Sequence, residues 1–313
     1  MVFSNAFRAG WGAVRRSKRL LLCAALTTAL ISLPFGFWAG RAADVAGARR
    51  PDAKLVARSL DPDFFADVRA ANPSFDADAA ALVAAALVLM FFVKPLVTGG
   101  FVGIAATQKR LSFGKFVREG GNVYWKFLRI SAVEVVVMLG LSLALKPLLT
   151  TFDDWAQGAP GEDAARSRTW AAEGLAFGAL CAVAMVFDYA RIGVRMRRRP
   201  GVLAEIGRAA MFVVQHPFRT TGFYFAGLLL EIAVCAPFFL LVRIADGGYV
   251  LSSGVVLLLG QGVVALREGA RLFHLAGAWR IRQAEELPQA PARRPDESDG
   301  QDLLGERLPW HVS

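Results

Sequence analysis

Six stretches of this 313-residue chain stay apolar over the length that a helix needs to cross a bilayer. A hydrocarbon core of about 30 Å requires about 20 residues at 1.5 Å per residue. A mean hydropathy of +0.42 is too high for the surface of an ordinary soluble domain. We therefore predict an all-α fold, a polytopic membrane helix bundle with six transmembrane helices at about 20–40, 79–106, 130–149, 170–190, 220–244 and 250–270.

Basic residues lie on one side of these six stretches. Segments 1–19, 107–129 and 191–219 hold eighteen Lys and Arg residues, whereas the loops on the other side hold eight. Because basic loops stay in the cytoplasm, both termini are predicted to be cytoplasmic. The Ala- and Arg-rich character indicates a bacterial inner membrane. The net charge of +10 then favours anionic lipid headgroups at the cytoplasmic face as partners, and no nucleic acid.

Two of the basic segments also have amphipathic character. In "RLSFGKFVREGGNVYWKFLRI", Phe116 and Val123 alternate with Lys115 and Arg118. The segment "PGVLAEIGRAAMFVVQHPFRTTGFY" has the same pattern and is bounded by prolines. Such helices lie in the headgroup plane. We expect two interfacial amphipathic helices beside the six spans.

The domain organisation follows from these assignments. Residues 1–282 form the six-span membrane domain, and the Pro- and acid-rich residues 283–313 form a disordered cytoplasmic tail. The extracytoplasmic loop 41–78 contains "LDPDFFADVRAANPSFDAD". We interpret it as a small folded cap on the membrane surface, with a ligand-gathering lid and a disordered loop as alternatives.

Three segments carry a resemblance to a known group of proteins. They are "SFGKFVREGGNVYWKFLRI", "FDYARI" and "AAMFVVQHPFRTTGFY". With them, residues 80–275 resemble uncharacterised six-span bacterial membrane proteins of the glycerophosphodiester phosphodiesterase membrane-domain-like group. The resemblance implies a helical membrane bundle. It transfers no catalytic residue, because the phosphodiesterase barrel of about 250 residues has no counterpart in this chain.

No motif for catalysis or for cofactor binding occurs. The chain lacks a phosphate-binding loop, an H-E-x-x-H pair, a nucleophile elbow and a C-x-x-C pair. Its three histidines lie in different segments, which leaves little for a metal site. We predict a protein that is not an enzyme and that uses no cofactor.

Charged and polar residues inside the spans are the candidate functional residues, since a charge at the bilayer centre costs about 2.5–3.5 kcal/mol or more. Glu231 and Gln261 each lie eleven residues into neighbouring antiparallel spans, about 16 Å deep. A hydrogen bond between them would be a structural pin. The alternatives for Glu231 are a proton- or cation-coupled transport site and a contact to lipid or to a partner.

A second polar group is predicted near the cytoplasmic ends of spans three, four and six. Glu134, Asp188, Arg267 and Arg271 lie at similar depth, with Glu268 on a neighbouring face. Opposite charges at equal depth predict an ion-pair cluster, in which Asp188 pairs with Arg267 or Arg271. The alternative is that each of these charged side chains extends separately to water.

The function predicted from these features is a membrane-structural or partner-binding component, with a protein partner or a second copy of the chain. The alternative is a small-solute transporter or permease that uses Glu231. Geometry separates the two, because a transporter requires a cavity that reaches Glu231 and is lined by further polar groups.

Overall fold

The computed structural model describes residues 2–47, 69–70, 73–159, 161–197, 201–246 and 253–286. Within these ranges the chain forms α-helices and no β-strand, which confirms the all-α class. The helices are α1 (Val2–Arg16), α2 (Lys18–Gly47), α5 (Phe75–Thr107), α6 (Phe113–Gln157), α7 (Glu162–Met196), α8 (Val202–Gln215), α9 (Pro217–Asp246) and α10 (Ser253–Glu286). The predicted cap falls largely on 48–68, outside the described residues.

Four helices are long and apolar enough to cross a membrane: α5, α6, α7 and the Pro217–Pro237 part of α9. The number rises to five if α1 and the Lys18–Pro34 part of α2 form one bent span, so six spans are not confirmed. The apolar windows of α5 and α6 are only 6% buried within the protein. These surfaces therefore need an apolar environment outside the chain, and the protein is a helical membrane protein.

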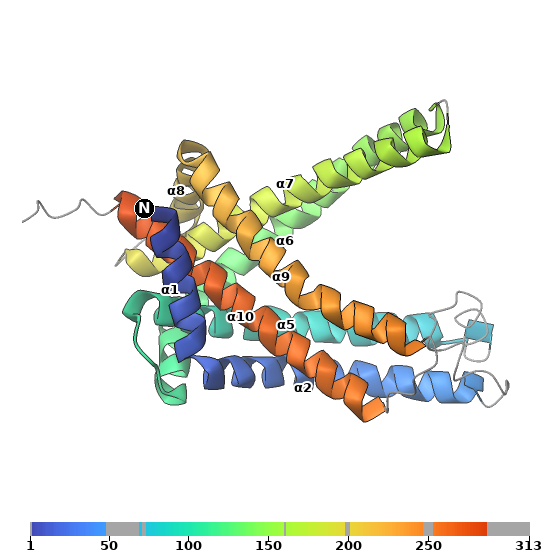
Figure 1. Cartoon of the computed structure of the whole chain (residues 1–313), viewed down its shortest axis with the longest axis horizontal. Helices are drawn as coiled ribbons and strands as arrows, with labels where there is room; N and C mark the ends of the chain where they lie inside the picture. Colours follow the sequence, from blue (N-terminus) through green and yellow to red (C-terminus); the bar gives the residue numbers. More distant parts are fainter. Residues whose placement is uncertain are drawn as a thin grey trace, which may run out of the picture.

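Three antiparallel helix pairs build the molecule: α2 with α5, α6 with α7, and α9 with α10. They converge at one end, which also holds α1, α8 and the C-terminal end of α10 and which we call the closed pole (Figure 1). Toward the opposite end, α6 and α7 diverge from the other two pairs. The buried core, which includes Phe101, Phe127, Phe223 and Phe273, occupies the closed pole.

Glycines set the close approach of α5 and α6 at that pole. A Cβ atom on Gly99 would lie 2.8 Å from Val123 Cγ2 and 2.9 Å from Gly120 Cα. A Cβ atom on Gly120 would overlap the carbonyl oxygen of Leu96. The Gly99-x-x-x-Gly103 spacing therefore serves helix packing, as small-residue spacings do in membranes. Gly174 and Gly178 have the same spacing, but a Cβ atom added to either of them would have no neighbouring atom within 4 Å.

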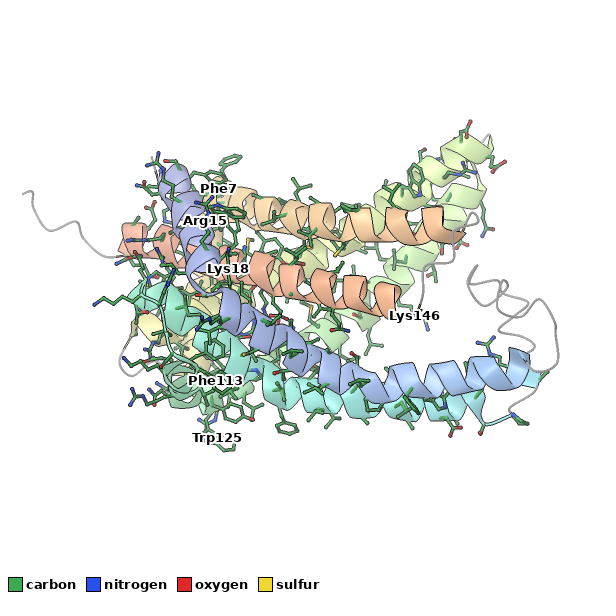
Figure 2. All side chains as sticks on the ribbon, turned by 60° about the horizontal axis from the view of Figure 1, so that its bottom comes forward. Phe7, Arg15, Lys18, Phe113, Trp125 and Lys146 are labelled. Carbon is green, nitrogen blue, oxygen red and sulfur yellow. The ribbon has the colours of Figure 1, made fainter. Side chains whose placement is uncertain are left out.

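The first predicted interfacial helix is not a separate element. Residues 113–129 continue without a break into the next apolar stretch, and together they form the 45-residue α6. Neither proline nor glycine occurs between Gly121 and Gly140, so nothing interrupts the helical hydrogen bonds there. Phe113 and Trp125, on its exposed face, lie at the closed pole in Figure 2.

The second predicted interfacial segment is a separate helix, α8. It ends at Gln215 because Pro217 follows, and the residue before a proline avoids the helical conformation. His216 accordingly has φ −126° and ψ 51°. Proline at the first position of α9 then starts the next helix, where its missing N–H is not needed.

An amphipathic helix that we did not predict lies at the N-terminus. The chain bends by 76° at Ser17, between α1 and α2. α1 packs against α10, where a Cβ atom on Gly10 would lie 2.7 Å from Phe273. Its exposed face carries aromatic side chains four residues apart, at Phe3, Phe7 and Trp11. Figure 2 labels Phe7 on this helix and, two turns further along it, Arg15.

The C-terminal end of α10 reaches beyond the predicted end of the membrane domain. The helix continues to Glu286, so residues 283–286 of the predicted tail are helical. Glu285 and Glu286 pair with Arg219 and Arg197. These ion pairs tie the last turn of α10 to α7 and α9. Residues 287–313 lie outside the described residues.

Candidate functional site

A cavity of about 450 Å³ lies where α2, α5, α6, α7, α9 and α10 come together. Six of the seven polar residues singled out from the sequence line it: Glu231, Glu134, Asp188, Arg267, Glu268 and Arg271. Apolar side chains, among them Leu87, Met90 and Leu228, form other parts of its wall. The structure thus joins the two predicted polar groups, which we treated as separate, into one site.

Gln261 is the exception. It does not line the cavity, and no hydrogen bond joins it to Glu231 in the described part of the chain. The two residues do not lie at the same depth, because a Cβ atom on Gly227 would lie 3.1 Å from His274, so that Glu231, one turn further along α9, is level with Arg271 of α10 and not with Gln261. Glu231 faces the cavity, while α10 presents Arg267, Glu268 and Arg271 to it.

Arg191 is the centre of the ion-pair network at the cavity wall. Its guanidinium, 4% exposed, donates to Glu134 of α6 and, over 2.9 Å, to Asp188 one turn earlier in α7. It also donates to Ser131 Oγ over 3.2 Å. Breaking a buried pair of this kind by removing one partner typically costs about 3–5 kcal/mol. The network therefore holds α6 against α7.

Arg267 and Arg271 do not pair with Asp188, in contrast to the predicted cluster. Arg271 donates to Thr98 Oγ1 of α5 over 2.8 Å. The second carboxylate oxygen of Asp188 lies 3.7 Å from His274 Nε2. The pairing differs because Arg191, one turn along the same helix, reaches Asp188 first.

Several charged groups around the cavity have no ion-pair partner within 4 Å among the described residues: Lys94, Arg267, Glu231 and Glu268. Glu268 Oε2 and both ring nitrogens of His274 are buried and lack a hydrogen bond. Polar groups buried in this way are costly unless something bonds to them. Lys94 and Arg267 are exposed, so the buried polar atoms without a partner at this cavity are those of Glu268 and His274.

Sequence reasoning missed three residues of this site. Lys94 lies inside the predicted span 79–106, so the rule that singled out Glu231 applies to it as well. Arg191 was assigned to a cytoplasmic loop because the predicted span ended at residue 190, whereas α7 continues to Met196. His274 lies beyond the predicted span 250–270, and nothing in the local sequence connects it with Asp188.

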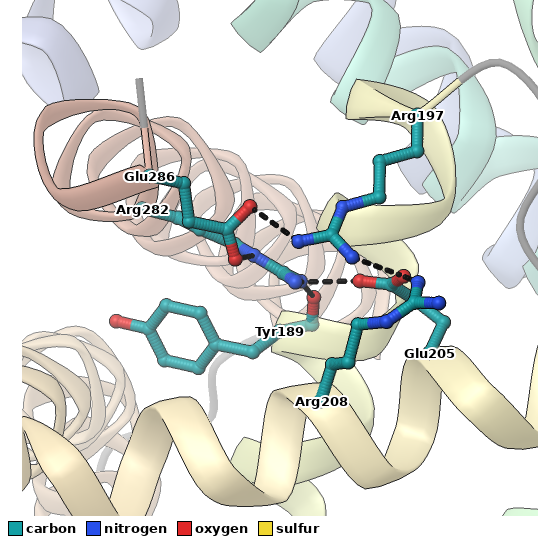
Figure 3. Close-up of polar contacts among 6 residues, drawn as sticks. All are labelled: Tyr189, Arg197, Glu205, Arg208, Arg282 and Glu286. Atoms are coloured by element: carbon teal, nitrogen blue, oxygen red, sulfur yellow. Dashed lines mark hydrogen bonds and ion pairs between the residues drawn. The ribbon is translucent and has the colours of Figure 1, made fainter. Parts of the chain in front are cut away.

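A second charged cluster lies at the closed pole, and we call it the Glu205 cluster (Figure 3). Glu205 of α8 and Arg282 of α10 are both fully buried and pair over 2.5 Å. Arg208 and Arg197 lie 2.8 and 3.6 Å from the other oxygen of Glu205. Glu286 pairs with Arg282 over 2.7 Å and with Arg197 over 3.1 Å.

Two backbone features make room for the Glu205 cluster. The guanidinium of Arg282 donates to the carbonyl oxygen of Tyr189 in α7. A Cβ atom on Gly193 would overlap both Glu205 and Arg282, so only glycine fits there. The cluster joins the ends of α7, α8 and α10, and its charges pair with one another. We therefore assign it to stability rather than to binding.

Comparison of the chain with family models, with curated proteins and with solved structures finds no match. The described part of the chain holds no group of three His, Cys, Asp or Glu side chains arranged for a metal ion. The class of protein is therefore defined by the fold and the site together: a helical membrane protein with a charged cavity among its helices.

Proposed function

We propose that the protein is a membrane permease or carrier that binds a small polar solute in the cavity at Glu231. The observation that carries the proposal is the convergence of charged residues from five helices on one cavity of about 450 Å³. This volume lies in the range of small-molecule sites. Ionisable residues within membrane-spanning helices usually mark solute or ion pathways.

The four cavity charges without an ion pair support a solute over a purely structural role. A structural network satisfies its own charges, as Arg191 does with Glu134 and Asp188. Glu231 and Glu268 do not follow this pattern. A bound solute would provide their missing partners.

Uptake into proteoliposomes tests the proposal. A panel of radiolabelled amino acids, amines, carboxylates and phosphate esters is offered to wild type, to Glu231→Gln and to Glu173→Gln. Glu173 is an exposed carboxylate of α7 outside the cavity, so it serves as the matched control. We expect uptake of at least one solute class, abolished by Glu231→Gln and retained by Glu173→Gln. Equal uptake by wild type and Glu231→Gln, or no uptake across the panel, would refute the proposal.

A membrane-structural or partner-binding component is the second candidate. The observation that favours it is the Arg191 network, which links α6 to α7 without any solute. In that case the cavity charges would be met by a protein partner or by a second copy of the chain. Chemical cross-linking in native membranes, followed by mass measurement of the product, distinguishes such a partner from a monomeric carrier.

The proposed setting is a bacterial inner membrane, with six spans and both termini in the cytoplasm. α10 supplies the sixth span in this arrangement, since it runs beside α9 between the same two poles (Figure 1). The closed pole faces the cytoplasm, in agreement with its basic loops. α8 lies in the headgroup plane, with Leu203, Met211 and Val214 on its exposed face toward anionic lipid. We propose no catalytic role and no cofactor, and the family resemblance stays a prediction.

A further inference from the structure

α1 turns a strip of aromatic side chains toward the outside of the protein. Its buried side packs against α10 and consists of small residues, Ala6, Gly10 and Ala13. Beside this side lie Phe3, Phe7 and Trp11, which we call the aromatic strip and which remain 43–50% exposed. Phe7 also meets Phe273 of α10 edge to face, with 5.0 Å between the ring centroids. The core therefore holds the aromatic strip in place, while about half of its surface faces outward.

The outer side of α1 and the start of α2 are basic. Arg8 and Arg15 are exposed on α1, and Arg15 lies 5.5 Å from the centre of the Trp11 ring. Lys18 and Arg19 are exposed directly after the bend into α2. We call these four side chains the basic strip. The first 43 residues contain no Asp or Glu. No carboxylate within the described ranges lies within 4 Å of the basic strip, so its charge needs a partner from outside these ranges.

The bend between α1 and α2 places α1 across the membrane-spanning helices. α1 makes an angle of 76° with the Lys18–Pro34 part of α2. Figure 1 shows it running across the closed pole, transverse to α2 and α5. With α2 and its partner α5 along the membrane normal, α1 lies close to the membrane plane. Its 15 residues extend over about 22 Å, which is too short to cross a hydrocarbon core of about 30 Å.

Two exposed residues of α6 give the level of α1 relative to the headgroups. Phe127 of α6 and Phe273 of α10 belong to one core cluster at the closed pole. Trp125 and Arg129, on either side of Phe127 in the sequence, are exposed. Tryptophan and basic residues concentrate where membrane-spanning helices meet the headgroups. Because α1 contacts Phe273, it lies at this level as well.

From these features we infer that α1 is a membrane-surface helix that binds anionic phospholipid in the headgroup layer at the closed pole. The aromatic strip lies among the upper parts of the acyl chains, and the basic strip contacts the phosphate groups. Amphipathic helices with aromatic residues beside basic ones bind membranes in this way. The lipid then provides both the apolar contact for the exposed rings and the negative charge for the cations. This inference does not depend on the proposed solute site.

The position of the aromatic strip is tested by fluorescence quenching in the full chain. Cysteine-free protein receives a single bimane-labelled cysteine at Phe7 or at Asn5, in nanodiscs of phosphatidylcholine and phosphatidylglycerol. Asn5 is the matched control, because it is exposed and lies two residues away, on the other side of α1. We expect lipid with brominated acyl chains to quench bimane at Phe7 at least threefold more strongly than at Asn5. Equal quenching at the two positions would overturn the inference.

The role of the basic strip is tested by native mass spectrometry of lipid that the protein retains. Phosphatidylglycerol and phosphatidylcholine with identical acyl chains are offered together. Each basic residue near an anionic surface strengthens the attraction about fivefold. We therefore expect Arg8→Gln with Arg15→Gln to lower the ratio of retained phosphatidylglycerol to phosphatidylcholine at least threefold. Thermal unfolding checks the fold, and if the double variant unfolds, the two substitutions are measured singly.

Arg69→Gln with Arg166→Gln is the control for net charge. It removes the same number of charges, but each of these exposed arginines already pairs with a carboxylate, Asp76 or Glu162. We expect this variant to keep the wild-type lipid ratio. An equal fall in both double variants, or no fall in either, would contradict lipid binding by α1.

The same cysteine variant distinguishes lipid from a second copy of the chain. If another copy covers the aromatic strip, a bifunctional thiol reagent links two chains at Phe7→Cys, and brominated lipid does not quench bimane there. That result would replace the inferred lipid contact by a protein interface. With lipid as the partner, we expect the chain to stay monomeric after treatment with the reagent.

Discussion

Removal of Glu205 is expected to destabilise the protein more than removal of its partner Arg282. Both side chains are fully buried, but their remaining partners differ. Without Glu205, the buried guanidinium of Arg282 keeps one carboxylate, Glu286 at 2.7 Å, and three arginines face that single acid. Without Arg282, Glu205 keeps Arg208 at 2.8 Å and Arg197 at 3.6 Å.

The magnitudes follow from this difference. Glu205→Gln leaves a buried charge undercompensated, which costs about 3–5 kcal/mol. Arg282→Met removes one charged contact while Glu205 remains paired, which costs about 1.5–3 kcal/mol. The double variant, Glu205→Gln with Arg282→Met, removes both charges of the pair, so neither is left buried alone. Its loss is expected to be smaller than the sum of the two single losses, since the residues are in direct contact.

The assay is reversible unfolding by sodium dodecyl sulfate in mixed micelles, followed by circular dichroism. Glu162→Gln is the control, because Glu162 forms an exposed ion pair with Arg166 and such pairs contribute little. We expect its free energy of unfolding to stay within about 0.5 kcal/mol of wild type. A loss for Arg282→Met equal to or larger than that for Glu205→Gln would refute the reasoning.

Three further predictions concern the fold. Gly120→Leu is expected to lower the thermal unfolding temperature, because the added side chain would force α5 and α6 apart. Gly174→Leu, where the added side chain meets open space, should unfold at the wild-type temperature. Equal shifts of the unfolding temperature would contradict the glycine contact. A cysteine placed at Gly158 should react with an impermeant thiol reagent in intact cells and one at Gly201 only after permeabilisation, and the reverse pattern would invert the topology. Arg191→Met should lower the free energy of unfolding by about 3–5 kcal/mol, because Glu134 and Asp188 lose their cation. A loss below about 1 kcal/mol would show that the network does not stabilise the fold.

Much of the fold could be predicted from hydropathy, because the membrane allows helices as the spanning elements of such a chain. The helix ends were less predictable. Residues 113–129 have an interfacial pattern, yet no residue breaks the helix before it enters the membrane, so α6 is continuous. α1 was not predicted, because its residues were interpreted only as basic charge for orientation. Its exposed aromatic strip at Phe3, Phe7 and Trp11 repeats every four residues and is visible in the sequence.

The candidate site could be predicted in its members but not in its pairings. Depth along a helix follows from residue number, and it singled out Glu134, Asp188 and Glu231 as members of two separate groups, whereas the structure places all three at one cavity. The face that each helix turns to its neighbours does not follow from depth. Nor does the register in which two helices pair, so Gln261 was assigned to Glu231, and Arg191 was not recognised as the partner of Asp188.

Water access to the cavity is the most direct test of the solute site, and it requires no knowledge of the solute. Cys23, Cys181 and Cys235 are first replaced by serine or alanine. Single cysteines are then placed at Leu228, which lines the cavity, and at Leu229, which is 63% exposed on the outer surface of α9. The rate of reaction with a charged methanethiosulfonate is measured in nanodiscs, where both membrane faces are accessible.

We predict that Leu228→Cys reacts rapidly and that Leu229→Cys, facing lipid, reacts at least about a hundredfold more slowly, as an aqueous cavity beside an apolar surface requires. Reaction of Leu228→Cys should also slow in the presence of a solute that the uptake panel identifies as transported. An unreactive Leu228→Cys, or equal rates at the two positions, would contradict the presence of a water-filled solute site at Glu231.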